Sequence, residues 1–170
     1  MDKLNNFRYG SELVNLVADN TLEGGLASCG YDDEGVECQK WHIVKDGILA
    51  GYGVNRELAH KMKMARANGT TRATKYSDVP ITRMPNLYLA PGKKPLSKEE
   101  LIADTESGIY IEGMGSFSID QMRLNMQFGG DAFWEIKNGK IAGMLKDVVY
   151  NAISYEFWRS CDAIADERAF

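Results

Sequence analysis

The sequence predicts an α+β fold, antiparallel and rich in β-strands, with hairpins and two or three short helices. Two segments, residues 39–53 and 133–143, each place an Asp-Gly or Asn-Gly pair between stretches of strand character. Such pairs favour type I′ turns, in which both central residues have positive φ, so each segment should form a tight β-hairpin. Strands and helices also do not alternate as βαβ units do, which argues against a parallel sheet.

The first hairpin should turn at Asp46-Gly47 and the second at Asn138-Gly139, and both return strands contain Ile/Leu-Ala-Gly. This likeness hints at an internal duplication, although the match is too short to prove one. Between the hairpins, prolines flank the apolar residues 86–90. Because proline cannot donate to a ladder in mid-strand, residues 86–90 should form a short strand framed by loops.

Helices are expected in three places. Ser97 and Glu100 fit the capping-box pattern, so a helix should run over residues 98–107 and stop at Gly108. A second helix should run over residues 56–67, and residues 154–165 are a candidate for the third. The second helix should bury one face, made of Leu58, Met62 and Ala65.

The composition suits one globular domain over residues 1–170. The net charge of -4 gives no global attraction to nucleic acid or to anionic lipid. No apolar run approaches the roughly 20 residues that span a bilayer, and the first residues do not resemble a signal peptide. We therefore expect a cytoplasmic protein with no membrane partner.

The three cysteines, Cys29, Cys38 and Cys161, form no Cys-x-x-Cys pair, so free thiols are expected. Cys29, Cys38 and His42 offer three soft ligands, but their spacing matches no common zinc module, and a buried pair of thiols beside a strand histidine is the favoured interpretation. Likewise, Asp32-Asp33-Glu34 offers a hard-cation site, but acidic residues beside glycines more often serve as turn and capping groups.

One stretch of the chain concentrates basic residues and has tyrosines nearby. It could hold phosphates or stack on bases, but on an acidic protein a solvated basic face is the favoured alternative, and a nucleic-acid partner is not expected. No nucleophile elbow, catalytic triad context or dinucleotide-binding loop is visible. The basic residues are Lys61, Lys63, Arg66, Arg72, Lys75 and Arg83.

Several turn-like motifs become informative as an ordered set. They are Gly10-Ser11-Glu12-Leu13-Val14-Asn15, Gly30-Tyr31-Asp32-Asp33-Glu34-Gly35, Arg83-Met84-Pro85-Asn86, Leu101-Ile102-Ala103-Asp104-Thr105-x-x-Gly108-Ile109-Tyr110, Ser116-x-Ser118-Ile119-Asp120 and Arg123-Leu124-Asn125-Met126-Gln127-Phe128-Gly129. In this order they resemble the C-terminal domain of the TldD/PmbA family, once described as modulators of DNA gyrase. The resemblance covers nearly the whole chain.

The resemblance implies a cytoplasmic zinc metallopeptidase that acts on unfolded peptides and leader peptides, as a homodimer or a TldD–TldE-type heterodimer. In catalytic members, His-Glu-x-x-x-His supplies two zinc ligands and a general base, and a cysteine supplies a further ligand. This sequence lacks the histidine motif. By motif order, that motif is expected upstream of Met1 and the cysteine beyond Phe170, so no zinc ligand is assigned here and Cys161 does not match one.

Three residues are weaker candidates. Arg72, Arg83 and Asn86 match segments that lie near the interior of the family's domain, and the resemblance implies contact with the substrate backbone. Bracing of loops is the favoured alternative, because Arg and Asn often satisfy loop carbonyls and amides. The chain is thus expected to be a C-terminal portion of a metallopeptidase that is inactive alone. The alternative is a standalone, non-catalytic peptide-binding or partner subunit.

Overall fold

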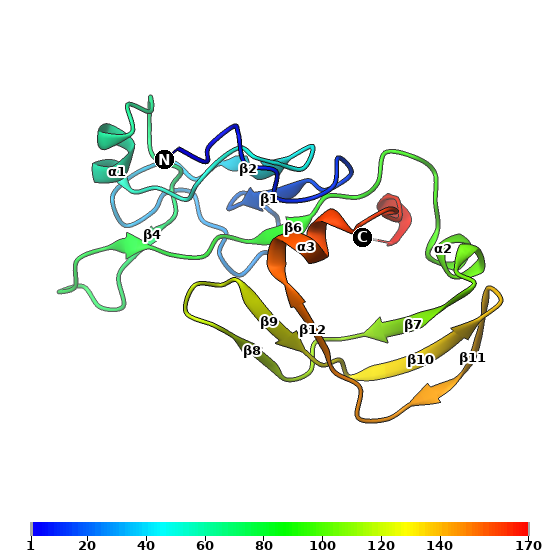
Figure 1. Ribbon diagram of the computed structural model, residues 1–170. Helices are drawn as coiled ribbons and strands as arrows, with labels where there is room; N and C mark the ends of the chain where they lie inside the picture. Colours follow the sequence, from blue (N-terminus) through cyan, green and yellow to red (C-terminus); the bar gives the residue numbers. More distant parts are fainter. Residues whose placement is uncertain (1, 170) are drawn as a thin grey trace. The chain divides into compact units, whose positions relative to one another are not determined.

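The computed structural model describes residues 2–169 (Figure 1). The chain divides into two compact units, Met1–Ala90 and Pro91–Phe170, called here the N-terminal and C-terminal units. Every strand pairing within the described residues is antiparallel, and three α-helices are present there, which confirms the predicted α+β class. The single-domain organisation stays a prediction. None of the helices described has the length and apolar character needed to cross a membrane.

The N-terminal unit is built on a four-stranded sheet with the strand order β3-β2-β1-β6. Its strands are β1 (Leu16–Asp19), β2 (Lys40–Lys45), β3 (Ile48–Leu49) and β6 (Leu87–Leu89). Strand β1 is central, and its residues Val17 and Ala18 are buried together with Val44 of β2. The strand predicted over residues 86–90 is therefore present as β6, and it pairs with β1.

Both predicted hairpins are confirmed, and both turn through residues with positive φ. Asp46 and Gly47 have φ values of 46° and 77° between β2 and β3. In the C-terminal unit, Asn138 and Gly139 have φ values of 49° and 73° between β10 (Ala132–Lys137) and β11 (Lys140–Leu145). The type I′ geometry matches the right-handed twist of the paired strands.

Helix α1 (Arg56–Lys61) begins as expected but is shorter than the predicted range of residues 56–67. The Asn55 side chain accepts a hydrogen bond from the Leu58 N–H at 2.8 Å and caps the start. The helix ends because the chain turns at Lys63, which has a φ of 55°. This turn returns Ala67 to a small core with Val54 and Ala59.

The predicted buried face of α1 was therefore wrong in part. Ala59 is the buried residue of the helix, whereas Leu58 is 38% exposed and Ala65 lies beyond the helix on the surface. Met62 does pack against the small core. Beyond α1, the chain forms the two-stranded ladder of β4 (Thr71–Arg72) and β5 (Ile81–Thr82).

The C-terminal unit contains two three-stranded sheets. In the first, β10 lies between β11 and β7 (Ser107–Glu112). In the second, β9 (Asn125–Phe128) lies between β12 (Tyr150–Ile153) and β8 (Phe117–Ile119). Helix α3 (Ser154–Arg159) continues directly from β12, so the third predicted helix exists but ends well before residue 165 (Figure 1).

Helix α2 (Lys98–Asp104) has the predicted capping box, with Ser97 and Glu100 exchanging both hydrogen bonds. Its predicted end was wrong, since Gly108 lies inside β7 and does not stop the helix. The helix ends early because Thr105 has an extended backbone, with a ψ of 108°, and the chain enters β7 at Ser107, where it pairs with β10. The second hairpin holds this exit, since the Asn138 and Gly139 N–H groups donate to the carbonyls of Glu106 and Thr105 at 2.6 and 3.0 Å.

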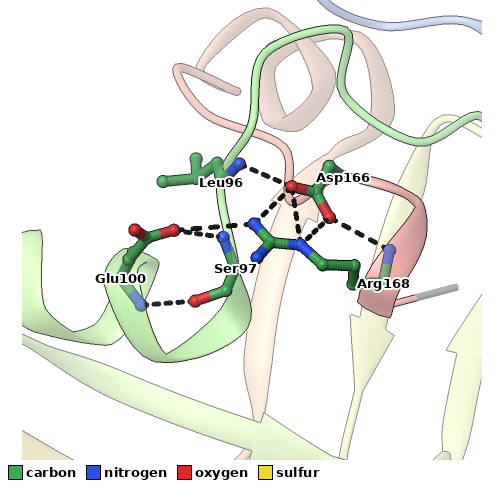
Figure 2. Close-up of polar contacts among 5 residues, drawn as sticks. All are labelled: Leu96, Ser97, Glu100, Asp166 and Arg168. Carbon is green, nitrogen blue, oxygen red and sulfur yellow. Dashed lines mark hydrogen bonds and ion pairs between the residues drawn. The ribbon is translucent and has the colours of Figure 1, made fainter.

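Asp166 ties the C-terminal segment to the start of α2 (Figure 2). Its buried carboxylate accepts hydrogen bonds from the Leu96 N–H at 2.7 Å and from the Arg168 guanidinium at 2.6 Å. The Arg168 guanidinium, followed by backbone N–H groups, holds the pKa of Asp166 well below its ordinary value. Arg168 lies in the short 3-10 helix Glu167–Ala169. Its guanidinium is also 3.8 Å from the carboxylate of Glu100, which belongs to the capping box.

We expect Gly47→Ala to destabilise the protein more than Gly24→Ala. Both glycines have positive φ, which costs a non-glycine residue about 1 kcal/mol. A methyl group at Gly47 would also meet the carbonyl oxygens of Ser11 and Gly10 at 2.4 and 2.5 Å, whereas Gly24 faces open space. We expect a loss of about 3 kcal/mol in the free energy of unfolding for Gly47→Ala, measured by urea denaturation. Equal losses in the two variants would contradict this steric argument.

Candidate functional site

Asn86, one of the three site residues predicted from the sequence, braces a loop. Its Oδ1 accepts a hydrogen bond from the Ala27 N–H at 2.9 Å, and its Nδ2 donates to the Asp19 carbonyl at 2.8 Å and to Ser28 Oγ at 2.9 Å. The Asn86 backbone N–H donates in turn to Asn20 Oδ1 at 3.3 Å. The carboxamide is thus engaged through both of its polar atoms, as the bracing alternative expects. Contact of Asn86 with a substrate stays a prediction.

Arg72 and Arg83 lie close to each other in the N-terminal unit, near the β4–β5 ladder. Arg72 Nη2 donates to the Met84 carbonyl at 2.7 Å, which again is a bracing contact. Arg83 is held through its backbone, since its N–H donates to the Thr70 carbonyl at 2.8 Å and its carbonyl accepts from Thr70 Oγ1 at 2.7 Å. Its exposed guanidinium makes no hydrogen bond or ion pair within residues 2–169. Of the three candidates, Arg83 is therefore the one whose side chain is unpaired among the described residues.

The basic stretch is partly neutralised by nearby acids. Lys61 pairs with Glu57 one helical turn away, and Arg66 lies 3.3 Å from Glu37. These are exposed pairs, of the kind expected on a solvated face. The contacts favour the solvated-face alternative.

The acidic loop serves as a set of caps. Asp32 is buried, and its Oδ1 accepts from the backbone N–H groups of Glu34 and Val36 at 3.0 and 2.9 Å. Its Oδ2 accepts from the Thr71 N–H at 3.0 Å and from Thr71 Oγ1 at 2.7 Å. Asp33 accepts from the Ala73 N–H at 2.7 Å. The turn-and-capping interpretation thus accounts for this motif.

These hydrogen bonds decide the pKa of Asp32. Burial alone would raise the pKa, but the bonds from Thr71, Val36 and Glu34 favour the ionised carboxylate and lower the pKa below its ordinary value. The carboxylate therefore stabilises the fold when it is ionised. The carboxylate joins the loop of residues 30–37 to Thr71 at the start of β4. It therefore also holds the backbone next to Arg72 in place.

The residues that the structure describes do not fit the zinc ion that the sequence resemblance implies. A catalytic zinc needs about three protein ligands from His, Cys, Asp or Glu side chains. Over residues 2–169, no group of three or more such side chains could hold a metal ion. Cys29 and Cys38 approach each other, with 3.1 Å between their sulfur atoms, but Cys29 is exposed and only Cys38 is buried. The expected pair of thiols exists, although only half of it is buried.

A cleft on the second sheet of the C-terminal unit was missed by sequence reasoning. It measures about 610 Å³ and is lined by residues of β8, β9, β12 and α3. Ser118, Gln127 and Asn151 are directly opposite one another across the three strands, so their side chains share one face. All three are exposed, and among the described residues their side chains make no hydrogen bond.

The other face of this sheet is aromatic. Phe117, Phe128 and Tyr150 are also aligned across the strands, and their rings stack at centroid distances of 6.2 and 5.8 Å. Phe157 of α3 extends the stack at 6.1 Å from Tyr150. The alternation of polar and apolar residues along residues 125–128 and 150–151 is the sequence signal that could have identified the two faces.

We expect Thr71→Val to lower stability at neutral pH and to flatten its pH dependence. Asp32 has a lowered pKa in the folded state, so its contribution is complete above the unfolded-state pKa and is lost as the pH falls through the folded-state pKa. Removing the Thr71 hydroxyl removes one bond to the carboxylate, with a loss of about 2 kcal/mol at neutral pH. Urea denaturation between roughly pH 7 and pH 2.5 measures the effect. Thr71→Ser, which keeps the hydroxyl, is the control, and a loss that does not change with pH would contradict the assignment.

We also expect Asn86→Ala and Arg83→Ala to differ in stability. Asn86→Ala leaves the Ala27 N–H and the Asp19 carbonyl without their partner, so the free energy of unfolding should fall by about 2 to 3 kcal/mol. Arg83→Ala removes an exposed guanidinium and should change it by no more than about 0.5 kcal/mol. Thermal and urea unfolding measure both. If Asn86→Ala proves as stable as the parent, the bracing role is wrong.

Comparison with known families matches residues 1–170 to the PmbA/TldA metallopeptidase C-terminal domain. A metalloprotease of Methanocaldococcus jannaschii is 37% identical over 166 residues, which cover 98% of this chain and 36% of that protein. A metalloprotease TldD homolog of Haemophilus influenzae is 31% identical over 157 residues, or 92% of this chain and 32% of that protein. The chain thus spans about a third of the length of these relatives.

Solved structures share the fold. TldE from Thermococcus kodakarensis matches with a TM-score of 0.80 at 20% identity, over 97% of this chain and 36% of that one. A Thermotoga maritima protein described as a modulator of a DNA gyrase matches with a TM-score of 0.82 at 21% identity, over the same shares of the two chains. The match over residues 1–170, together with the metalloprotease relatives, shows that this chain belongs to the TldD/PmbA metallopeptidase family, as its C-terminal domain.

Proposed function

We propose that this chain helps to hold the peptide substrate of a TldD/PmbA-type metallopeptidase that acts on unfolded or leader peptides, and that it does not cleave peptides by itself. The observation that carries the proposal is the row of unpaired polar side chains in the cleft, Ser118, Gln127 and Asn151. Family membership supplies the class of activity, since the relatives are named metalloproteases.

The row suits an extended polypeptide. A peptide backbone presents N–H and C=O groups in alternation, and the carboxamides of Gln127 and Asn151 can each donate and accept hydrogen bonds. Their strands are neighbours, so the two side chains lie about 5 Å apart along the row. The carboxylate of Glu156 also lines the cleft and favours a basic group on the peptide. Asp120, by contrast, is engaged by the N–H groups of Leu124 and Asn125.

No chemical step is assigned to these residues. Zinc would supply a metal-activated water in catalytic members, but the described residues offer no set of three ligands for it. We therefore propose that the zinc ligands come from outside this sequence. The part played by this chain is to bind and orient the peptide.

We further propose that the working assembly is a homodimer or a TldD–TldE-type heterodimer. The relatives include a TldD homolog, and the fold matches that of a TldE structure. Exposed apolar side chains on the C-terminal unit, such as Phe117 at 62% and Met144 at 71%, offer surface for association. The second candidate is a non-catalytic partner subunit that binds peptide without cleaving it, a role that the polar row of the cleft would serve equally well.

Binding of a fluorescent, disordered peptide to the purified chain tests the proposal by anisotropy. We expect the double variant Gln127→Ala/Asn151→Ala to weaken binding by about tenfold, because about 1.4 kcal/mol is lost with the two carboxamides. Gln121→Ala is the matched control, since Gln121 is exposed but does not line the cleft. The same peptide, incubated with the chain and Zn²⁺, should stay intact.

Three results would contradict the proposal. If the double variant binds the peptide with unchanged affinity, the cleft does not contact the peptide. Cleavage by the pure chain that EDTA abolishes would show that it holds a catalytic metal itself. Failure to bind any disordered peptide would reject the peptide-holding role, including that of the non-catalytic subunit.

A further inference from the structure

Cys29 and Cys38 are brought together by a short antiparallel ladder. Tyr31 and Glu37 form an isolated bridge, and the Cys38 N–H donates to the Gly30 carbonyl at 3.0 Å. The ladder closes the loop of residues 30–37 and places the two cysteines at its open end. Their sulfur atoms lie 3.1 Å apart, so a disulfide bond of about 2.05 Å needs a movement of only about 1 Å.

The two thiols differ in access. Cys29 is exposed, whereas Cys38 is 6% exposed and its thiol donates to the Gly69 carbonyl at 3.1 Å. Burial, and then the neighbouring Cys29 thiol, raise the pKa of Cys38 to about 12. A reagent in solution therefore meets the exposed Cys29 before the buried Cys38. Cys161 lies in the other unit and serves as an internal reference.

We propose that Cys29 and Cys38 are a redox modification site, at which a small disulfide converts the two thiols into an intramolecular disulfide. The Cys29 thiolate attacks one sulfur of the small disulfide, forms a mixed disulfide and releases one small thiolate. Cys38 then loses its proton, attacks the Cys29 sulfur and releases the second small thiol. The two cysteines are oxidised by two electrons, and the small disulfide is reduced to two thiols.

The new bond closes a ring around the loop of residues 30–37. That loop contains Asp32, whose carboxylate binds Thr71 at the start of β4. Closing the ring removes conformational freedom from the unfolded chain, so oxidation should stabilise the N-terminal unit. The carbonyl of Gly69 keeps its bond from Asn20 Nδ2 at 2.9 Å, so the loss of the Cys38 S–H donor leaves no buried carbonyl unpaired. This site does not depend on peptide binding by the cleft.

The test is to incubate the reduced chain with glutathione disulfide, alkylate the remaining thiols and map the products by mass spectrometry. We expect a peptide cross-linked between Cys29 and Cys38, with Cys161 alkylated as in the untreated chain. The oxidised chain should unfold at a higher urea concentration than the reduced chain. The same reaction in denaturing urea should lose this selectivity, because the ladder that aligns the two thiols is gone.

Single variants separate the two steps. Cys38→Ser should stop the reaction at a stable glutathione adduct on Cys29, and Cys29→Ser should leave Cys38 unmodified in the folded chain. If Cys38→Ser does not fold, Cys38→Ala provides the same readout without a buried hydroxyl. The proposal fails if the wild-type chain keeps three alkylatable thiols, or if glutathione stays on Cys29 while Cys38 is free. It fails equally if Cys161 is oxidised as readily as the pair.

Discussion

The buried carboxylate of Asp32 is the interaction on which the N-terminal unit depends. It accepts four hydrogen bonds, two from its own loop and two from Thr71, which is itself fully buried. A buried carboxylate is costly unless its oxygens are satisfied, and here each oxygen has two donors. Because Thr71 lies 39 residues from Asp32 in the sequence, the charge joins a loop to a strand that no continuous sheet connects to it.

A second brace, made of amides, lies beside this one. Asn20 and Asn86 link the end of β1 to the segment before β6, and Asn20 also reaches the carbonyl of Gly69. Cys38 donates to the same carbonyl, so the amide brace and the thiol pair meet at one backbone oxygen. At these points of irregular backbone in the N-terminal unit, polar side chains supply hydrogen bonds that no sheet provides. Asp32 and Asn86, whose side chains could bind a ligand, are therefore engaged in hydrogen bonds that hold the fold.

Features that depend on residues close together in the sequence could be predicted well. The Asp46-Gly47 and Asn138-Gly139 turns and the Ser97 capping box are determined by residues a few positions apart, and the structure confirms them. Helix ends were predicted less well, because α2 ends where the chain enters β7, and β7 is paired with the distant strand β10. The bracing roles of Asn86 and Asp32 also depend on partners more than 35 residues away. Such partners leave no periodic pattern in the sequence.

The cleft shows the opposite case, in which the signal was present but its meaning needed the strand register. Alternation along β9 separates Gln127 from Phe128, but only pairing with β8 and β12 collects three polar side chains on one face and three aromatic rings on the other. The rings stack with one another on the aromatic face. The three polar side chains on the opposite face make no hydrogen bond among the described residues. Asn86 has an amide whose partners are internal, whereas Gln127 and Asn151 have amides without partners among the described residues. An unpaired amide can bind a substrate without breaking a hydrogen bond of the fold, and for this reason we propose peptide contact in the cleft.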